Sequence, residues 1–347
     1  MDETVEPQSQ TTQNHAAAET FEFGAMGRLP QISYSTLAAE EAKRIATRYY
    51  GFPSTLSCIF YNRGFNDTYR LSLPKWEFAL RISQAKWKAR PALMAELDVV
   101  NHIHAKGINV ALPIRRADGG WITEIMAPDG VRRAIISRWA KGSRPKCCEL
   151  HARQFGRHLA RVHTALDDLA PLPALPNMDA NYLLRMSLDA IYPAIASDPE
   201  LLREFEDLGD RLGSRLNSAH KILRDWGACH GDVGNHNAHI IGDSCVLFDF
   251  EFCGWGWRLS DLASYRINSR FEGFEMQTWT PFIQEYLALR PGIESQLRYI
   301  GLFMCLRHLW VAARRTERLT EMGASSVPDT YYEMVVRLCK ELESEFP

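Results

Sequence analysis

Two short polar segments carry residues whose types and spacing suit phosphoryl transfer. One is His230-x-Asp232-x-x-x-x-Asn237, and the other begins at Asp249, directly after the apolar run 246–248. Phosphoryl transfer needs a carboxylate that orients and deprotonates the attacking hydroxyl, and oxygen ligands on separate segments that hold Mg²⁺ against nucleotide phosphates. One loop and one strand end would supply these groups, and their joint spacing favours this chemistry over coincidence.

The same stretch contains residue types that suit other chemistries. Cys229, His230, His236 and His239 could ligate zinc. A zinc site would leave Asp232 and the oxygen ligands of the Mg²⁺ type unexplained. A Cys–His nucleophile is disfavoured, because partners adjacent in sequence rarely reach the required geometry and no oxyanion-hole loop is evident. Phosphoryl transfer is the better interpretation.

The composition is that of an ordinary globular protein. The 347 residues are 46% hydrophobic and 24% charged, which is enough for a large core divided between two lobes. Lys and Arg number 40 against 42 Asp and Glu, so the net charge of −2 gives no general attraction to nucleic acid or an anionic membrane. We therefore expect a small or locally recognised partner.

Cysteine spacing and hydropathy indicate a cytoplasmic protein. The eight cysteines form no CxxC pair and no disulfide-scaffold spacing, so reduced thiols are the simplest interpretation. The longest apolar stretches fall short of a membrane span, and the N-terminus is acidic where a signal peptide would be basic and then apolar. We expect no contact with a membrane.

The N-terminal part is expected to form a small antiparallel sheet. Residues 1–31 are polar and lack periodicity, which predicts a disordered tail, and helical spacing follows at about 35–50. Segments at 55–61, 68–73 and 77–83 are rich in β-branched and aromatic residues and are separated by turn residues. They predict an antiparallel meander.

The first turn of this meander could cover nucleotide phosphates. Gly64 permits a close backbone approach, and Asn66 and Thr68 offer polar side chains. An ordinary hairpin turn is the favoured interpretation, since the motif has a single glycine.

Arg81 lies in the middle of an apolar strand, where an unpaired cation is costly. Glu96, on a helix expected at about 91–105, is the candidate partner. A strand cation paired with a helix glutamate positions nucleotide phosphates in kinases. The alternative is that Arg81 faces solvent on the polar side of the strand.

Further strands are expected at about 121–126 and 131–138. The chain then leaves the sheet through a stretch that contains Ser137 and Trp139 and ends in Gly and Pro residues. Such a stretch suits a hinge between lobes, and its exposed backbone could hydrogen-bond an adenine.

The remainder is mainly helical. Helices are predicted at about 147–167, 181–197, 199–225, 278–288, 294–315 and 329–345, interrupted by the loop and strand at 228–251. We accordingly assign residues 1–31 to a tail, 32–140 to a nucleotide-binding lobe and 141–347 to a helical lobe with the catalytic loop and substrate site.

Taken together, these segments resemble the aminoglycoside phosphotransferase and choline kinase-like family. The similar segments are 64–70, 78–82, Glu96, 159–163, 230–237, 249–251 and 254–263, in the expected order within about 50–310. The resemblance implies an α+β, two-lobed protein-kinase-like fold, with a small antiparallel β-sheet in the N-lobe and a mainly helical C-lobe.

The resemblance also implies roles for individual residues. Asp232 would be the catalytic base, Asn237 and Asp249 the Mg²⁺ ligands, and Arg81 with Glu96 the pair that positions the phosphates of ATP.

Two further roles concern the loop that holds the base. Asp261 would brace this catalytic loop from the start of a helix, and His230 would hold the loop backbone.

Several positions depart from the family pattern. The strand cation is Arg81 where many members have Lys, and His236 replaces the usual Gly, with a Gly at 234 instead. Trp257 and Arg258 stand where Asp-Pro is common, which predicts a bulky, cationic pocket rim.

Two more residues are candidates for contact with the acceptor. Glu251 replaces the Gly of protein kinases, which suits a small-molecule kinase, and Trp255 is a candidate pocket wall.

These observations predict an enzyme that uses ATP and Mg²⁺ to phosphorylate a hydroxyl group of a small molecule. Aminoglycosides, macrolides, choline-like and homoserine-like metabolites and sugars all remain open as acceptors, because no acidic surplus follows Asp261. A protein serine/threonine kinase and a catalytically silent nucleotide-binding protein are the alternatives. The sequence does not assign an oligomeric state.

Overall fold

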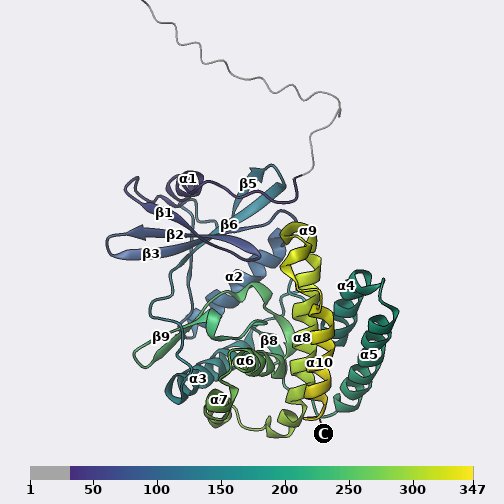
Figure 1. Ribbon diagram of the computed structural model, residues 1–347. Coiled ribbons are helices and arrows are strands. Elements are labelled where there is room, and N and C mark those ends of the chain that lie inside the picture. The colour runs from purple at the N-terminus through teal and green to yellow at the C-terminus, as the bar shows by residue number, and fades with distance from the viewer. Residues whose placement is uncertain (1–31, 347) are drawn as a thin grey trace, which may run out of the picture. The chain divides into compact units, whose positions relative to one another are not determined.

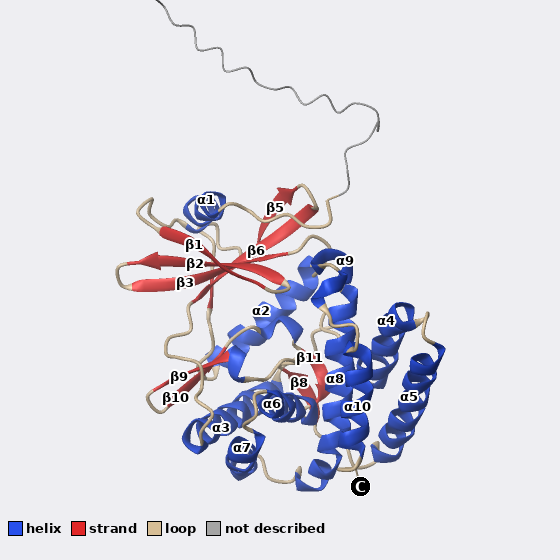
Figure 2. Cartoon of the chain, viewed as in Figure 1, coloured by secondary structure: helices blue, strands red, loops and turns tan. Residues whose placement is uncertain are grey.

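The computed structural model describes residues 32–346, and the tail expected at 1–31 lies outside the described residues. Residues from Ser33 onward form one compact unit. Figures 1 and 2 show an antiparallel sheet followed by a largely helical region, so the expected α+β, two-lobed protein-kinase-like fold is confirmed. The boundary placed at residue 140 stays a prediction.

The N-terminal sheet has the strand order β1-β2-β3-β6-β4, and β5 pairs with β6. Its strands are β1 (Ser57–Arg63), β2 (Asn66–Leu73), β3 (Trp76–Ser83), β4 (Pro113–Ile114), β5 (Thr123–Ala127) and β6 (Gly130–Arg138). All of its pairs are antiparallel, so the expected meander is confirmed. In this register Arg81 of β3 lies opposite Thr68 and Ile135, in the middle of the sheet.

One helix packs on each face of this sheet (Figure 2). Helix α1 (Ala39–Tyr50) buries Ala42, Ile45 and Ala46 in the apolar cluster that the strands form. Helix α2 (Arg90–Ala105) lies on the face of the sheet that is turned toward the helical lobe. Pro91 stands in its first turn, where the missing N–H of proline costs no hydrogen bond. It places Glu96 among buried apolar residues of the same helix.

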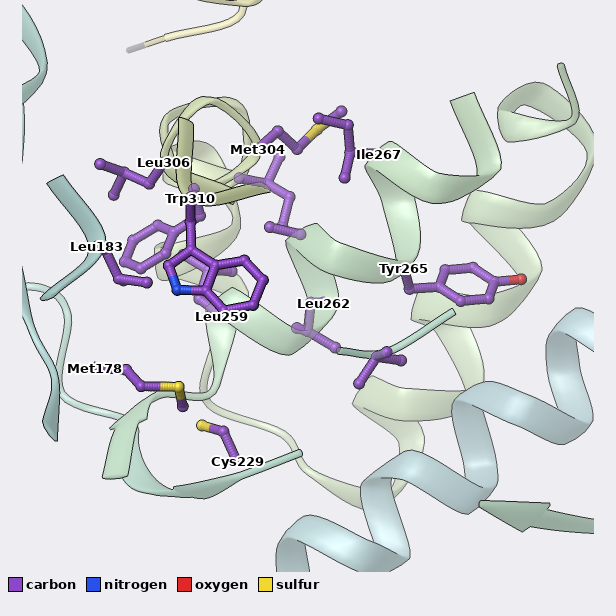
Figure 3. Close-up of a cluster of buried hydrophobic side chains, with 14 of the residues drawn as sticks. Met178, Leu183, Cys229, Leu259, Leu262, Tyr265, Ile267, Met304, Leu306 and Trp310 are labelled. Atoms are coloured by element: carbon purple, nitrogen blue, oxygen red, sulfur yellow. The ribbon is translucent and has the colours of Figure 1, made fainter. Parts of the chain in front are cut away.

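The helical lobe contains seven α-helices within the described residues. They are α3 (Glu149–Ala165), α4 (Met186–Ile195), α5 (Pro199–Ala219), α6 (Leu259–Phe271), α7 (Glu275–Leu289), α8 (Ile300–Glu317) and α10 (Tyr331–Glu343), with a single turn, α9 (Leu319–Met322), after α8. Figure 3 shows part of their core, where Trp310 of α8 lies beside Leu259 of α6. Apolar packing between α6 and α8 therefore supports the segment before α6, which carries the polar motif.

Two features of this lobe differ from the sequence prediction. Helix α5 ends at Ala219 rather than near 225, and α6, whose start at Asp261 only the family resemblance implied, was not among the helices predicted from periodicity. Helix α6 buries Asp261, Ser264 and Ser269 together with its apolar residues, so it lacks the one-sided apolar stripe that predicts a helix.

Short strands frame the polar motif at 230–251. Strand β8 (Trp226–Cys229) leads into it and pairs with β11 (Gly254–Trp257), which also pairs with β7 (Asn177–Met178). Strands β9 (Ala238–Ile241) and β10 (Ser244–Leu247) form a hairpin between its two halves. This hairpin brings Asn237 and Asp249 back to the same end.

The described residues hold no helix that is long and apolar enough to cross a membrane. All eight cysteines are free thiols.

Candidate active site

The loop between β8 and β9 is held by Asp261 from the first turn of α6. One carboxylate oxygen of Asp261 accepts a hydrogen bond from the backbone N–H of His230 at 2.7 Å, and the other accepts from that of Gly231 at 2.8 Å. His163 of α3 contacts the same carboxylate at 3.0 Å, and the side chains of Asp261, His163 and His230 are buried. Burial raises the pKa of Asp261, but the hydrogen bonds from His163 and the loop outweigh it and the net pKa lies below the usual range.

The first two residues of this loop, His230 and Gly231, are held by hydrogen bonds of the imidazole ring and by a left-handed backbone conformation. The Nδ1 atom of His230 accepts from the Asp232 N–H at 3.2 Å, so Nε2 carries the proton and donates to the Phe248 carbonyl at 3.0 Å. Gly231 has a φ of 83°, and a Cβ atom there would lie 2.1 Å from the carbonyl oxygen of Phe252. A glycine is therefore required at this position.

The carboxylate of Asp232 lies between two polar neighbours. The side-chain amide nitrogen of Asn237 donates to the Oδ2 atom of Asp232 and to the backbone carbonyl of Asp232, each at 2.9 Å. Arg307 of α8 donates from Nη2 to the Oδ1 atom and from Nη1 to the Gly231 carbonyl at 2.8 Å. The ring of His236 stands 3.4 Å from Oδ2.

The ionisation of Asp232 is set by a competition between burial and the neighbouring side chains. Burial raises the pKa of the carboxyl, but the Arg307 guanidinium, followed by His236, holds the pKa well below its usual range. Asp232 is therefore an ionised hydrogen-bond acceptor at neutral pH, which suits a group that orients a hydroxyl.

A cavity of about 290 Å³ adjoins Asn237 and separates the sheet from the helical lobe. Among the residues selected from the sequence, those that line it are Thr68, Arg81, Glu96, Ser137, Trp139, Asn237 and Asp249. Its walls are largely apolar away from these residues, with Ala79, Val100 and Ile135 among them. Apolar walls with a few converging polar groups at one end suit a nucleotide with its base inside and its phosphates near the loop.

The polar end of the cavity contains a network of buried charges. The Arg81 guanidinium pairs with Glu96 and lies 3.0 Å from the Asp249 carboxylate, so the partner expected for this strand cation is present. Lys88 pairs with the other oxygen of Glu96 at 2.5 Å and donates to the Glu251 carbonyl at 2.7 Å. Burial raises the pKa of Glu96, but the two cations lower it to a net value of about 2.

Asn237 and Asp249 offer oxygen atoms toward the same space. Both hydrogen bonds of Asn237 use its amide nitrogen, which leaves the amide oxygen for a ligand. Asp249 adopts a left-handed backbone conformation with a φ of 62°, and its carboxylate is 43% exposed with Arg81 as its ion-pair partner. These two oxygen ligands suit Mg²⁺, which is usually bound by one or two protein side chains together with the phosphates of the nucleotide.

The described residues contain no group of three or more His, Cys, Asp and Glu side chains that could hold a metal ion.

The β1–β2 turn is tied to the helical lobe rather than left open. Asn66 is buried and donates to Glu251 at 2.7 Å, and the Gly64 carbonyl accepts from Arg318 at the end of α8 at 2.8 Å. Thr68 is the one residue of the predicted phosphate-covering trio that lines the cavity.

At the expected hinge, the backbone is already partly occupied. The Trp139 N–H donates to the Glu77 carbonyl at 3.0 Å, and the Ala140 carbonyl accepts from His239 at 2.7 Å. An adenine at this end of the cavity needs other backbone groups of the same stretch.

The expected cationic rim at 257–258 is wrong. Arg258 is 1% exposed and pairs with Asp167, and its guanidinium lies 3.9 Å from Asp225. Trp257 packs edge-on against Trp226 and Phe303. Both therefore take part in the internal packing of the helical lobe.

Trp255 and Glu251 also lie away from the cavity. The indole of Trp255 donates to the Leu172 carbonyl at 3.4 Å. Glu251 is buried and accepts hydrogen bonds from Asn66 and Trp87, and burial, followed by the charge of Asp249, raises its pKa to about 7. Glu251 therefore links the two lobes, and neither residue faces the Asp232 carboxylate.

Gly234 does not supply a bend. Its φ of −174° is extended, and a Cβ atom would lie 2.6 Å from the His236 ring and 2.7 Å from Asn268. Close packing, rather than a turn, accounts for the glycine.

Four residues at the site were not assigned roles from the sequence: Lys88, His163, Arg307 and Arg318. Lys88 lies in a segment without periodicity, so no local signal identified it. Arg307, Arg314 and Arg318 recur at helical spacing on α8, and this pattern could have suggested a basic face near the site.

An antiparallel sheet followed by a helical region, with the polar loop between them, defines a protein with a kinase-like fold. The profile of the phosphotransferase enzyme family, APH, matches residues 60–294. The chain therefore belongs to this family of small-molecule kinases.

Three individual relatives share less than a third of their aligned residues with this chain. Uncharacterized protein sll1119 of Synechocystis sp. is 27% identical over 315 residues, which cover 90% of this chain and 87% of that protein. A homoserine kinase of Chelativorans sp. is 26% identical over 59% of this chain and 63% of its own length. The solved structure of amicoumacin kinase hAmiN in complex with AMP-PNP, Ca²⁺ and Ami aligns with a TM-score of 0.71 at 18% identity, covering 90% of this chain and 95% of that one.

Proposed function

We propose that this enzyme uses Mg²⁺ to transfer the γ-phosphoryl group of ATP to a hydroxyl group of a small molecule. The observation that carries the proposal is the position of Asn237. Its amide nitrogen fixes the Asp232 carboxylate at 2.9 Å, while its side chain lines the same cavity as Arg81 and Asp249. One residue thus joins the group suited to orient a hydroxyl to the groups suited to hold phosphates.

In this mechanism the acceptor hydroxyl donates a hydrogen bond to Asp232. Its oxygen attacks the γ-phosphorus, the bond from phosphorus to the ADP oxygen breaks, and Asp232 accepts the hydroxyl proton. Because the pKa of Asp232 is low, the carboxylate acts mainly by orienting the nucleophile and accepts the proton late. Arg81 stabilises negative charge on the phosphates from a fixed position.

Bound Mg²⁺ would neutralise charge on the β- and γ-phosphates. Asn237 and Asp249 are the residues that would hold it, since both offer oxygen atoms at the cavity end. Asp261 and His230 would act indirectly, by keeping the loop in shape.

The acceptor is a small molecule such as an antibiotic or a choline-like or homoserine-like metabolite. A relative named homoserine kinase supports a metabolite, and the fold shared with amicoumacin kinase is compatible with an antibiotic. A protein acceptor and a silent nucleotide-binding role remain the alternatives, and a cytoplasmic location stays a prediction.

The test is coupled ADP release with Mg²⁺ and ATP across aminoglycosides, macrolides, choline, homoserine and sugars. Wild-type enzyme should turn over at least one small acceptor, and Asp232→Asn should lower kcat at least about 100-fold while ATP affinity is kept. Undiminished turnover by Asp232→Asn would refute the role of this residue. Phosphate incorporated into protein but into no small molecule would favour the protein kinase, and ATP binding without any transfer would favour the silent protein.

A further inference from the structure

Arg307 occupies the position that an acceptor must approach. It lies on α8, its guanidinium contacts Asp232 and Gly231, and its Cζ atom lies over the Trp310 ring, 4.6 Å from the ring centroid. The side chain is 11% exposed. An acceptor hydroxyl that donates to Asp232 therefore lies beside this cation.

The guanidinium retains donors for a ligand. Its hydrogen bonds within the described residues use one N–H toward the Gly231 carbonyl and one toward Asp232, so other N–H groups of the planar fork are left. The cation–π contact with Trp310 restricts how the guanidinium can turn. A carboxylate or phosphate is the partner that such a preoriented fork binds best.

Neighbouring groups add to this donor character. The indole N–H of Trp310 is buried without a hydrogen-bond partner, and the indole lies beside Leu183 (Figure 3) in a small cavity that Arg307 also lines. Arg314 lies over the other part of the same indole, 5.7 Å from its centroid, and its Nε–H is also unpartnered. Unpaired buried donors cost free energy, and an anion nearby would lower that cost.

Four glutamates that follow Asp261 in the chain are already paired with arginines. Glu272 pairs with Arg144, Glu275 with Arg266 and Arg270, Glu317 with Arg314, and Glu321 with Arg318. A polycationic ligand would have to displace these arginines and would meet Arg307 beside the reacting hydroxyl. The charge arrangement favours an anion instead.

We propose that Arg307 makes this site selective for an acceptor that carries an anionic group, a carboxylate or a phosphate, close to the hydroxyl that is phosphorylated. The inference rests on the proposed function and narrows its substrate class. Arg307 is here a specificity-determining residue, and Asp232 keeps its role toward the hydroxyl.

Matched acceptors test the proposal. Homoserine and 3-amino-1-propanol differ only by a carboxylate. Glycerol is the uncharged member of a second set, in which glycerate has a carboxylate in place of one hydroxymethyl group and glycerol 3-phosphate has a phosphate on one hydroxyl. We expect wild-type kcat/KM to be about 10- to 100-fold higher for the anionic member of a pair. Comparison of glycerate with glycerol 3-phosphate separates the two sources of negative charge.

Substitution of Arg307 supplies the second comparison. Arg307→Gln should remove the preference chiefly through KM of the anionic acceptor, and Arg307→Lys should keep part of it. Arg315→Gln is the matched control, because Arg315 lies on the same helix but stacks on Tyr331 of α10. Thermal unfolding and ATP titration of each variant show whether it is folded and binds nucleotide.

The outcomes separate this inference from the function on which it rests. Turnover of neutral or cationic acceptors without a gain from the anion would overturn the inference alone. An equal loss of kcat for all acceptors in Arg307→Gln would also overturn it, because Arg307 would then only position the loop. Failure of the wild-type enzyme to phosphorylate any acceptor while it binds ATP would count against both.

Discussion

Arg318, at the C-terminal end of α8, donates a hydrogen bond of 2.8 Å to the carbonyl of Gly64 in the β1–β2 turn. Its guanidinium also lies 4.6 Å from the centroid of the Phe65 ring. Glu321, which pairs with Arg318, accepts from Gln84 at 2.9 Å, so a second contact joins the same two regions. The turn nearest the nucleotide cavity is thus held from the helical lobe.

Arg318→Met should loosen this turn and raise KM for ATP about 3- to 10-fold, because one hydrogen bond to the turn backbone is lost while the apolar contact with Phe65 is kept. The effect on kcat at saturating ATP should be smaller. Steady-state kinetics with varied ATP measure both. Arg337→Met, at an exposed position on α10, is the control, and an unchanged KM for ATP in Arg318→Met would contradict the role of the contact.

Asp261→Asn should damage the loop that carries Asp232. The substitution preserves size but replaces one accepting oxygen with a donor that faces a backbone N–H. We expect the free energy of unfolding to fall by about 2–4 kcal/mol and kcat to fall at least about tenfold, with ATP binding less affected. Urea unfolding, kcat and ATP titration check this. Asp210→Asn, at an exposed site on α5, should leave all three unchanged; equal behaviour of the two variants would rule out the brace.

The sheet and its central ion pair were predictable because their signals are local. Alternation and turn residues place β1, β2 and β3, and a cation in the middle of an apolar strand requires a partner, which Arg81 finds in Glu96. Periodicity did not predict helix α6, because it buries polar and apolar residues together and shows no apolar stripe; only the family resemblance implied a helix start at Asp261.

Contacts between distant segments account for the other differences. Arg307 meets Asp232 across 75 positions of the chain, and no local pattern specifies that approach. Arg258 was expected at a rim because it stands, with Trp257, where Asp-Pro is common in the family, but Asp167 and Asp225 from other segments pair with it inside the lobe. Local patterns therefore identify which residues are polar and adjacent to the loop, and tertiary packing decides which of them face the ligand.

Arg81→Lys should reveal what the arginine adds to the usual lysine. The guanidinium spans Glu96 and Asp249, and one ammonium group cannot contact both with the same geometry. We expect kcat/KM for ATP to fall about tenfold with a modest loss of stability, since Lys keeps a charge beside Glu96. Arg81→Met should destabilise the fold further, because Glu96 would then rely on Lys88 alone. Kinetics and urea unfolding of the two variants measure these effects, and full activity of Arg81→Lys would show that the Asp249 contact is dispensable.

His158 of α3 predicts a pH dependence of stability that is independent of the site. Burial lowers the pKa of its imidazole to about 4, although a backbone contact with Asn109 partly offsets the effect. The unfolded chain has a histidine pKa near 6.5, so between pH 6.5 and 4 the unfolded state takes up a proton that the folded state does not. The contribution of His158 is therefore constant above pH 6.5 and falls by about 3 kcal/mol as the pH drops to 4.

His158→Gln should flatten this part of the profile. The difference in the free energy of unfolding between the variant and the wild-type protein should shift in favour of the variant by up to about 3 kcal/mol between pH 7 and 4. Urea unfolding at a series of pH values measures it. His104→Gln, at an exposed position on α2, should follow the wild-type profile. Parallel profiles for His158→Gln and the wild-type protein would mean that the buried imidazole is protonated in the folded state and that the shift in its pKa is absent.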